Sequence, residues 1–230
     1  MELENFENWY NNEAIELWKK FGGAQVLVPH LLPKIQINPD VLFIGMNPSH
    51  RLDWIQKVLE SNKQDFNSYG VDELFSYPGE SLAKRLPYIT LMEEYARDNV
   101  QYYRVLDDLV SKCGYKSWTH LDLFLNRETE QGKFLKIIEY NESNNYFNEF
   151  GLEQLNLFKK AFNKLKPKIV VVNNATASVI ISQLFTGEGV TKTCIKYQNV
   201  TIFLGGMLSG QRAMDRFSKL RLINEIKLIS

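Results

Sequence analysis

The chain is poor in the residues that build disulfide frameworks and metal sites. Its 230 residues include two cysteines, Cys113 and Cys194, and three histidines, His30, His50 and His120. The cysteines form no framework, and the widely spaced histidines form no HExxH-type pair. We therefore expect no zinc site, no other metal and no cofactor.

An excess of either charge is also missing. The sequence holds 27 basic and 27 acidic residues, so its formal net charge is zero. A protein that binds nucleic acid as a general polycation would carry a clear positive excess. That class is disfavoured, although a local basic patch remains compatible with the composition.

Long apolar runs, repeats and linkers are absent as well. No stretch has the length and hydrophobicity of a membrane span, and the early Glu2, Glu4 and Glu7 are unlike a signal peptide. We expect a cytoplasmic protein without membrane contact. Without a linker that would separate domains, we expect a single domain over residues 1–230 and a monomer.

Apolar strand-like runs alternate with helical periodicity along the chain. Strands are predicted at 41–46, 120–125, 169–172 and 193–204, the last with a possible antiparallel partner that turns at 198–199. Helices are predicted at 4–20, 52–60, 81–112 with a break near Pro87, 151–165, from 175 onward, and at 212–228. This alternation predicts an α/β three-layer sandwich with a central, mostly parallel four-stranded sheet and helices on both faces.

The first predicted strand delivers a polar residue from an apolar run. Val41-Leu42-Phe43-Ile44 leads into Gly45-Met46-Asn47-Pro48. Proline restricts the residue before it to extended conformations, so Asn47 is expected to have a fixed direction. The simpler interpretation is a strand-ending turn, because Asn-Pro is a common turn starter.

If the four strands are parallel, the loops after them meet at one edge of the sheet. These loops supply Asn47, Ser49, His50, Asp122, Asn126, Asn173, Asn174, Ser209, Gln211 and Arg212. The set is rich in amides, which both donate and accept hydrogen bonds and so suit a heterocycle edge or a neutral water. Simpler roles are helix capping for Asn173-Asn174 and for Asp122 or Asn126, and a solvated helix face for the basic residues that begin at Arg212.

Two of these loops resemble motifs of the uracil-DNA glycosylase superfamily. Gly45-Met46-Asn47-Pro48-Ser49 resembles its first motif, closest to the mismatch-specific thymine/uracil and single-strand-selective branches. Met207-Leu208-Ser209 followed by Arg212 resembles the second motif, an inserting loop. Tyr77-Pro78-Gly79 is similar to a segment between the motifs in the thymine branch.

The resemblance implies a DNA glycosylase that flips a deaminated, mismatched or modified base and hydrolyses its N-glycosidic bond. Asn47, helped by the main chain of Met46, would position the attacking water. Asp122 or Asn126 would read the base edge, and Phe75 or Tyr77 would stack on the flipped base. DNA binding would fall to Met207, Ser209, Gln211 and Arg212.

The chain departs from this pattern at two positions. Met207 stands where many members have a histidine that stabilises the departing base, and Leu208 replaces a proline. Asp122 would be an unusual reader, because a carboxylate accepts from an exocyclic amine but repels the oxygens of uracil. A non-catalytic module that binds a nucleotide or modified base on the same fold is the alternative. An unrelated nucleotide-binding α/β protein is a third possibility.

Overall fold

The computed structural model describes residues 6–21, 27–77, 82–210 and 212–229. Its contacts divide the chain into two compact units. We call Met1–Ile35, Asn47–Arg97 and Phe124–Leu157 the helical unit, and Gln36–Met46, Asp98–Leu123 and Phe158–Ser230 the sheet unit. The expectation of one domain over the whole chain stays a prediction.

The sheet unit contains a mixed five-stranded sheet in the order β2-β1-β3-β5-β4. The strands are β1 (Val41–Gly45), β2 (Trp118–Asp122), β3 (Ile169–Val172), β4 (Cys194–Tyr197) and β5 (Val200–Leu204). β1 pairs in parallel with β2 and β3, and β3 pairs in parallel with β5. The α/β class is confirmed, but the predicted count of four strands is wrong, because β4 adds an antiparallel edge strand.

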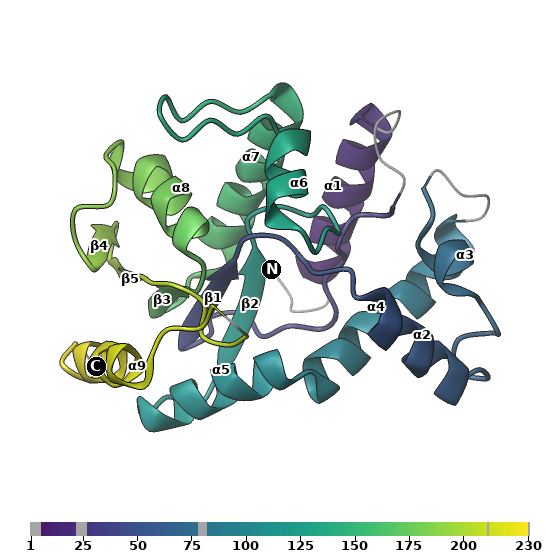
Figure 1. Ribbon diagram of the computed structural model, residues 1–230, viewed down its shortest axis with the longest axis horizontal. Helices are drawn as coiled ribbons and strands as arrows, with labels where there is room; N and C mark the ends of the chain where they lie inside the picture. The colour runs from purple at the N-terminus through teal and green to yellow at the C-terminus, as the bar shows by residue number, and fades with distance from the viewer. Residues whose placement is uncertain (1–5, 22–26, 78–81, 211, 230) are drawn as a thin grey trace. The chain divides into compact units, whose positions relative to one another are not determined.

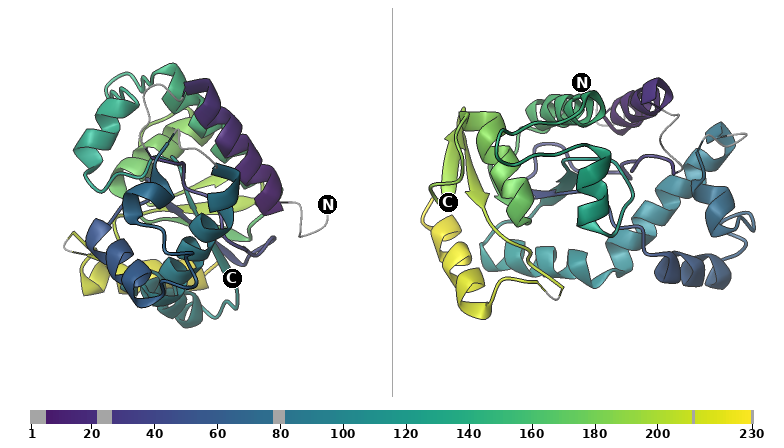
Figure 2. Two further views of the ribbon diagram at one scale, coloured as in Figure 1. Left: turned by 90° about the vertical axis from the view of Figure 1, so that its right-hand side faces the viewer. Right: turned by 45° about the horizontal axis from the view of Figure 1, so that its top comes forward.

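The extra strand comes from the segment that was expected to hold the fourth. β4 and β5 form a hairpin, and the two residues between them are Gln198 and Asn199. Gln198 has the left-handed φ of 53° that such tight turns favour. Figure 2 shows this hairpin with α8 (Ala175–Thr186) beside it. The antiparallel partner that turns at these residues is therefore confirmed.

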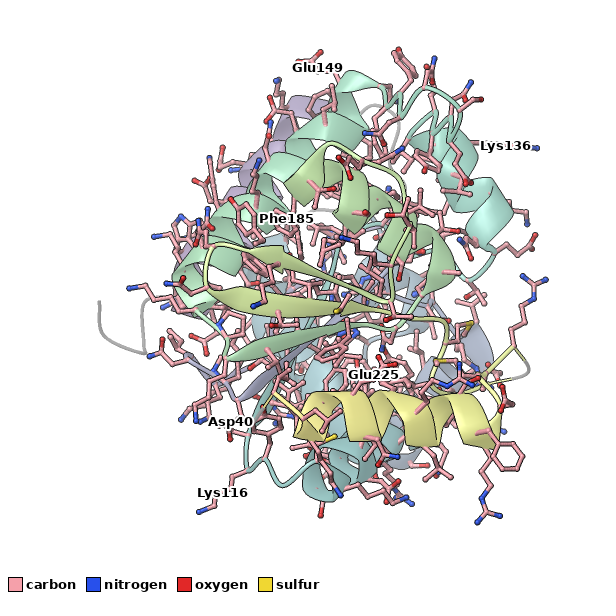
Figure 3. All side chains as sticks on the ribbon, turned by 90° about the vertical axis from the view of Figure 1, so that its left-hand side faces the viewer. Asp40, Lys116, Lys136, Glu149, Phe185 and Glu225 are labelled. Atoms are coloured by element: carbon pink, nitrogen blue, oxygen red, sulfur yellow. The ribbon has the colours of Figure 1, made fainter. Side chains whose placement is uncertain are left out.

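Helices cover both faces of the sheet. α5 (Gln101–Lys112) and α9 (Arg216–Lys227) pack on one face, where Phe43, Val171 and Phe203 join the apolar side chains of both helices in one core. Figure 3 shows α9 on one side of the strands and α8 on the other. β1 and β3 are buried at every position, which is the pattern of parallel strands covered twice. This arrangement is compatible with the predicted three-layer sandwich.

The helical unit has a core of its own, rich in aromatic side chains. α1 (Phe6–Phe21) contributes Phe6, Tyr10 and Trp18, and the Trp18 indole donates to the Leu27 carbonyl at 2.9 Å. The other helices in this unit are α2 (Leu52–Ser61), α3 (Val71–Phe75) and α6 (Gln131–Ile137). Two more, α4 (Leu82–Asn99) and α7 (Glu149–Leu165), are divided between the units, and Figure 1 labels all of them.

Three predicted boundaries are wrong. Pro87 lies inside α4, and the break between α4 and α5 comes at Val100 instead. β2 ends at Asp122, although the buried apolar run continues through Leu125. α9 begins at Arg216, because the Asp215 carboxylate caps it by accepting from the amides at 217 and 218. Arg212 therefore lies in a turn before the helix and does not open it.

Candidate active site

The strand order places a topological switch point at the carboxyl ends of β1 and β3. From β1 the chain reaches its neighbour β2 on one side and later its neighbour β3 on the other. Ligands of open α/β sheets commonly bind outside such ends. In the sheet unit these ends carry Gly45-Met46 and Asn173. The backbone amide of Asn173 donates to the Ile44 carbonyl at 3.0 Å, and this hydrogen bond joins the ends of the two strands.

Gly45 makes room for the Asp122 carboxylate. The two residues are direct partners in the β1–β2 ladder. A Cβ atom at position 45 would lie 2.1 Å from Asp122 Oδ1 and 3.0 Å from His120 Nε2. Any side chain larger than hydrogen would therefore collide with a carboxylate that is 6% exposed. This close approach explains the glycine that ends the apolar run of β1.

A buried polar chain leads away from Asp122 beneath this edge. His120 Nε2 lies 3.8 Å from Asp122 Oδ1 and 2.9 Å from the Tyr102 hydroxyl oxygen. Asn173 Nδ2 donates to the same hydroxyl at 2.5 Å. Asn173 Oδ1 is buried without a hydrogen-bond partner among the described residues. The arrangement leaves one acceptor of the chain available to a donor.

Tyr102 stays protonated in this chain. Burial raises its pKa well above the usual value, the charge of Asp122 and the neighbouring Tyr103 raise it further, and the bond from Asn173 lowers it. A neutral phenol has one proton to donate, and His120 Nε2 is within reach of it. Sequence reasoning missed Tyr102, because nothing in α5 marks one of its two tyrosines as facing a strand end.

Asn47 lies in the helical unit and is fixed by its amide nitrogen. Nδ2 donates to three backbone carbonyls: Glu128 at 2.7 Å, Asn126 at 3.2 Å and Pro48 at 3.3 Å. Three acceptors around one nitrogen determine the orientation of the amide, so Oδ1 points away from them. No described residue donates to Oδ1. The side chain is half-buried, fixed in direction and left with an available acceptor.

The loop after Asn47 is attached to the segment after Asn126. The Glu128 amide donates to the Pro48 carbonyl at 3.1 Å. Thr129 Oγ1 accepts from the His50 amide at 3.1 Å and lies 3.2 Å from Ser49 Oγ. Asn126 itself is 3% exposed and meets Asn47 through its backbone carbonyl. The structure thus brings Asn47 and Asn126 together.

The ring of Phe75 is fully buried between two polar side chains. Arg127 lies over the ring at 4.7 Å from its centroid, and His50 meets it edge-on at 5.2 Å. Burial and the nearby Arg127 charge lower the pKa of His50 to about 4, so its imidazole is neutral at pH 7. In this arrangement the ring of Phe75 is not accessible for stacking.

Arg85 fixes the backbone between Phe75 and Tyr77. This buried guanidinium donates through Nη1 to the carbonyls of Glu73, Leu74 and Ser76 at 2.7–3.1 Å. A cation that binds the last carbonyls of a helix stabilises the helix end, and Arg85 does this at the end of α3. Tyr77 follows and is half-buried. The next residues of the resemblance, Pro78 and Gly79, lie outside the described residues.

A buried ion-pair network supports the same part of the helical unit. Arg127 Nη2 contacts Glu93 Oε1 at 2.5 Å, and Glu93 Oε2 lies 3.2 Å from His30 Nε2. Arg127 also donates to the carbonyls of Val28 and Pro29. Burial raises the pKa of Glu93, but Arg127 and His30 outweigh it and bring the value to about 2. No sequence motif marked this network, because its members are far apart along the chain.

The loop after β5 is anchored at both ends in the sheet unit. The Gly205 amide donates to the Val172 carbonyl at 3.0 Å, and the Met214 amide donates to the Met207 carbonyl at 2.7 Å. Leu208 is buried in the core beneath α5 and α9. Ser209 is half-buried and Arg212 is exposed, whereas Gln211 lies outside the described residues. A backbone hydrogen bond therefore joins Met207 to Met214, and Arg212 between them is exposed.

The two asparagines after β3 differ in role. Asn174 Oδ1 accepts from the Ala177 amide at 3.0 Å and caps α8, as its simpler interpretation predicted. Asn173 belongs instead to the buried chain with Tyr102.

The remaining predicted site residues are distributed between the two units. Asn47, Asn126, Phe75 and Tyr77 lie in the helical unit, and Met46, Asp122, Met207, Ser209 and Arg212 lie in the sheet unit.

The described ranges contain neither a candidate metal-ligand group nor a candidate membrane-spanning helix. There, no group of three or more His, Cys, Asp or Glu side chains is arranged to hold a metal ion. Within the same ranges, no helix is both long and apolar enough to cross a membrane. No protein-family model and no curated protein matches the chain.

Proposed function

We propose that this protein is a DNA glycosylase that hydrolyses the N-glycosidic bond of a flipped deaminated, mismatched or modified base. The bond between the sugar C1′ and the base nitrogen breaks, and the base leaves with the electron pair and then takes up a proton. The oxygen of a water forms the new bond to C1′ and loses a proton. The products are a free base and an abasic site.

The observation that carries the proposal is the fixed amide of Asn47. Its nitrogen is occupied by three carbonyls, and its oxygen is left as an acceptor. An acceptor fixed in direction can hold a water by one of its protons and aim the oxygen at C1′. Such positioning accelerates a reaction without a strong base. This suffices when the leaving group departs largely on its own, and the main chain of Met46 would complete the water site.

Base recognition follows from the chemistry of Asp122. Its carboxylate can only accept hydrogen bonds while it is ionised, so it suits a base that presents an exocyclic amine. Asn126 is the alternative reader of the base edge, and Phe75 or Tyr77 would stack on the flipped base. Met207, Ser209, Gln211 and Arg212 would contact the DNA.

A second candidate is a module that binds a nucleotide or modified base without cleaving it. Two observations favour it. Phe75 is covered by Arg127 and His50, and Met207 occupies the position where many superfamily members stabilise the leaving base with histidine. A protein of this kind would retain base binding but lack turnover.

One experiment separates the two candidates. The protein is incubated with single-stranded and duplex oligonucleotides that carry uracil, mismatched thymine, and deaminated or alkylated bases with exocyclic amines. Alkali cleavage then reports abasic sites, and fluorescence anisotropy reports binding on the same set. Abasic sites above the protein-free control on at least one substrate support the glycosylase. Binding that prefers one base, with no abasic product, supports the module.

A further inference from the structure

α9 begins with an aromatic side chain that the fold leaves in solvent. Phe217 is 76% exposed, and none of the rings in the described ranges packs against it. Its backbone is nevertheless fixed, because its amide donates to Asp215 Oδ1 at 2.8 Å in the helix cap. The ring of Phe217 therefore contributes little to the core and is accessible to a partner.

The surroundings of Phe217 are positively charged. Residues 212–221 contain four basic side chains, Arg212, Arg216, Lys219 and Arg221, and one acidic side chain, Asp215. The Asp215 carboxylate is engaged by the amides of Phe217 and Ser218 and by the Ser218 hydroxyl. Those hydrogen bonds hold its pKa below the usual range. The net charge of the segment favours an anionic partner.

The same carboxylate occupies the start of the helix. Free amides at a helix N-terminus would attract phosphate, but the amides at 217 and 218 already donate to Asp215. These two amides are therefore already occupied, and the basic side chains are the groups that remain to bind a nucleic acid strand.

We infer that Phe217 is a stacking platform for an unpaired base of a nucleic acid strand, with Arg212 and Arg216 on the flanking phosphates. Aromatic side chains beside cations are the usual means of binding single strands, because every base has a stacking face and every linkage a charge. The segment that ends at Met214 precedes this helix directly, so Arg212 lies five residues before Phe217 in the chain, and both side chains are exposed. The inference rests on the proposed function in taking DNA as the partner, and it adds a contact outside both motifs.

The rival occupant of this face is a protein. Leu220 and Leu228 are also exposed, at 44% and 84%, and a partner helix would use them together with Phe217. Leu228 lies eleven residues from Phe217, which is about 16 Å along a helix at 1.5 Å per residue. A base stacked on Phe217 would not reach Leu228, so this leucine is a matched control.

The test is a titration of a labelled single-stranded oligonucleotide at several salt concentrations, followed by anisotropy. Phe217→Ala should bind on the order of 10- to 100-fold more weakly at every salt concentration, with an unchanged salt slope, because stacking releases no counterions. Arg216→Ala should lower the slope by roughly 0.7. Leu228→Ala should bind as the wild type does. In Phe217→Trp the added tryptophan emission should be quenched when DNA binds, which reports stacking directly.

The outcomes separate this inference from the proposed function. Equal affinity of Phe217→Ala and wild type, an equal loss in Leu228→Ala, or no binding by the wild type would each overturn the stacking platform. Base release is measured in the same preparations. Binding that depends on Phe217 without base release removes the glycosylase and keeps the platform, whereas release with binding that is independent of Phe217 does the opposite.

Discussion

The Asp122 carboxylate occupies the space that a side chain at Gly45 would need. The distance from an added Cβ to Asp122 Oδ1 would be 2.1 Å, and the two residues face each other across the β1–β2 ladder. β1 thus ends in glycine because its neighbour carries a buried carboxylate at the same level. The Asp122 carboxylate can occupy this position only because residue 45 has no side chain.

Gly45→Ala should destabilise the protein by about 1–3 kcal/mol, the usual cost of overpacking a closely packed site. Asp122→Ala in the same chain removes the carboxylate and should return part of that loss. Chemical denaturation of the single and double variants measures the coupling. Additive free energies of unfolding would show that the two residues do not compete for space.

Glu93→Gln should destabilise the protein by about 3–5 kcal/mol, because it leaves Arg127 buried without its countercharge. The neighbouring Glu94→Gln in α4 is the control, and its free energy of unfolding should stay within about 0.5 kcal/mol of wild type. Urea denaturation compares them. Similar losses in the two variants would mean that the pair with Arg127 contributes nothing specific.

Acid should weaken the fold through His50. Its pKa in the folded state, about 4, lies below the usual 6.5, since burial and Arg127 outweigh the opposing charges of Glu93, Glu128 and Asp72. The unfolded chain therefore binds a proton first as the pH falls. The stability that neutral His50 contributes is complete above pH 6.5 and is lost as the pH falls toward 4.

Thermal unfolding of wild type and His50→Asn between pH 7.5 and 4.5 measures this contribution. The wild type should lose more of its melting temperature over that range than the variant does, because only the wild type has this imidazole to protonate. Parallel curves would assign the acid sensitivity to other groups.

The sequence was sufficient to predict the main helices and strands, but not the polar contacts between them. β1 and β3 are continuous apolar runs ended by Gly45 and Asn173, so their positions followed from hydrophobicity alone. The end of β2 did not, because Leu123 to Leu125 remain apolar after the hydrogen-bonded ladder stops. The start of α9 could have been predicted better, since Asp215 is a common capping residue.

Several side chains of the candidate site were predicted from the sequence, but the groups that hydrogen-bond to them were not. Asn47 was identified from its place after β1, but the three carbonyls that hold it come partly from residues about 80 positions away, a distance no local pattern spans. Arg127 and Glu93 are 34 residues apart, and no local pattern in the sequence connects them. β1, β2, β3 and β5 run in parallel, so the loops after them begin at one edge of the sheet, as expected.

The most direct test of the central claim is the single-turnover rate of base release by wild type, Asn47→Ala and Thr129→Val on a substrate that the wild type cleaves. Thr129→Val is the control. It removes the hydrogen bonds of Thr129 to Ser49 and to the His50 backbone amide in the same loop, but it leaves the side-chain amide of Asn47 and its three carbonyl partners in place. If Asn47 positions the water, Asn47→Ala should be slower by roughly 10²-fold or more, and Thr129→Val should stay close to wild type. Equal rates for Asn47→Ala and wild type would contradict the account, as would an equal loss in both variants.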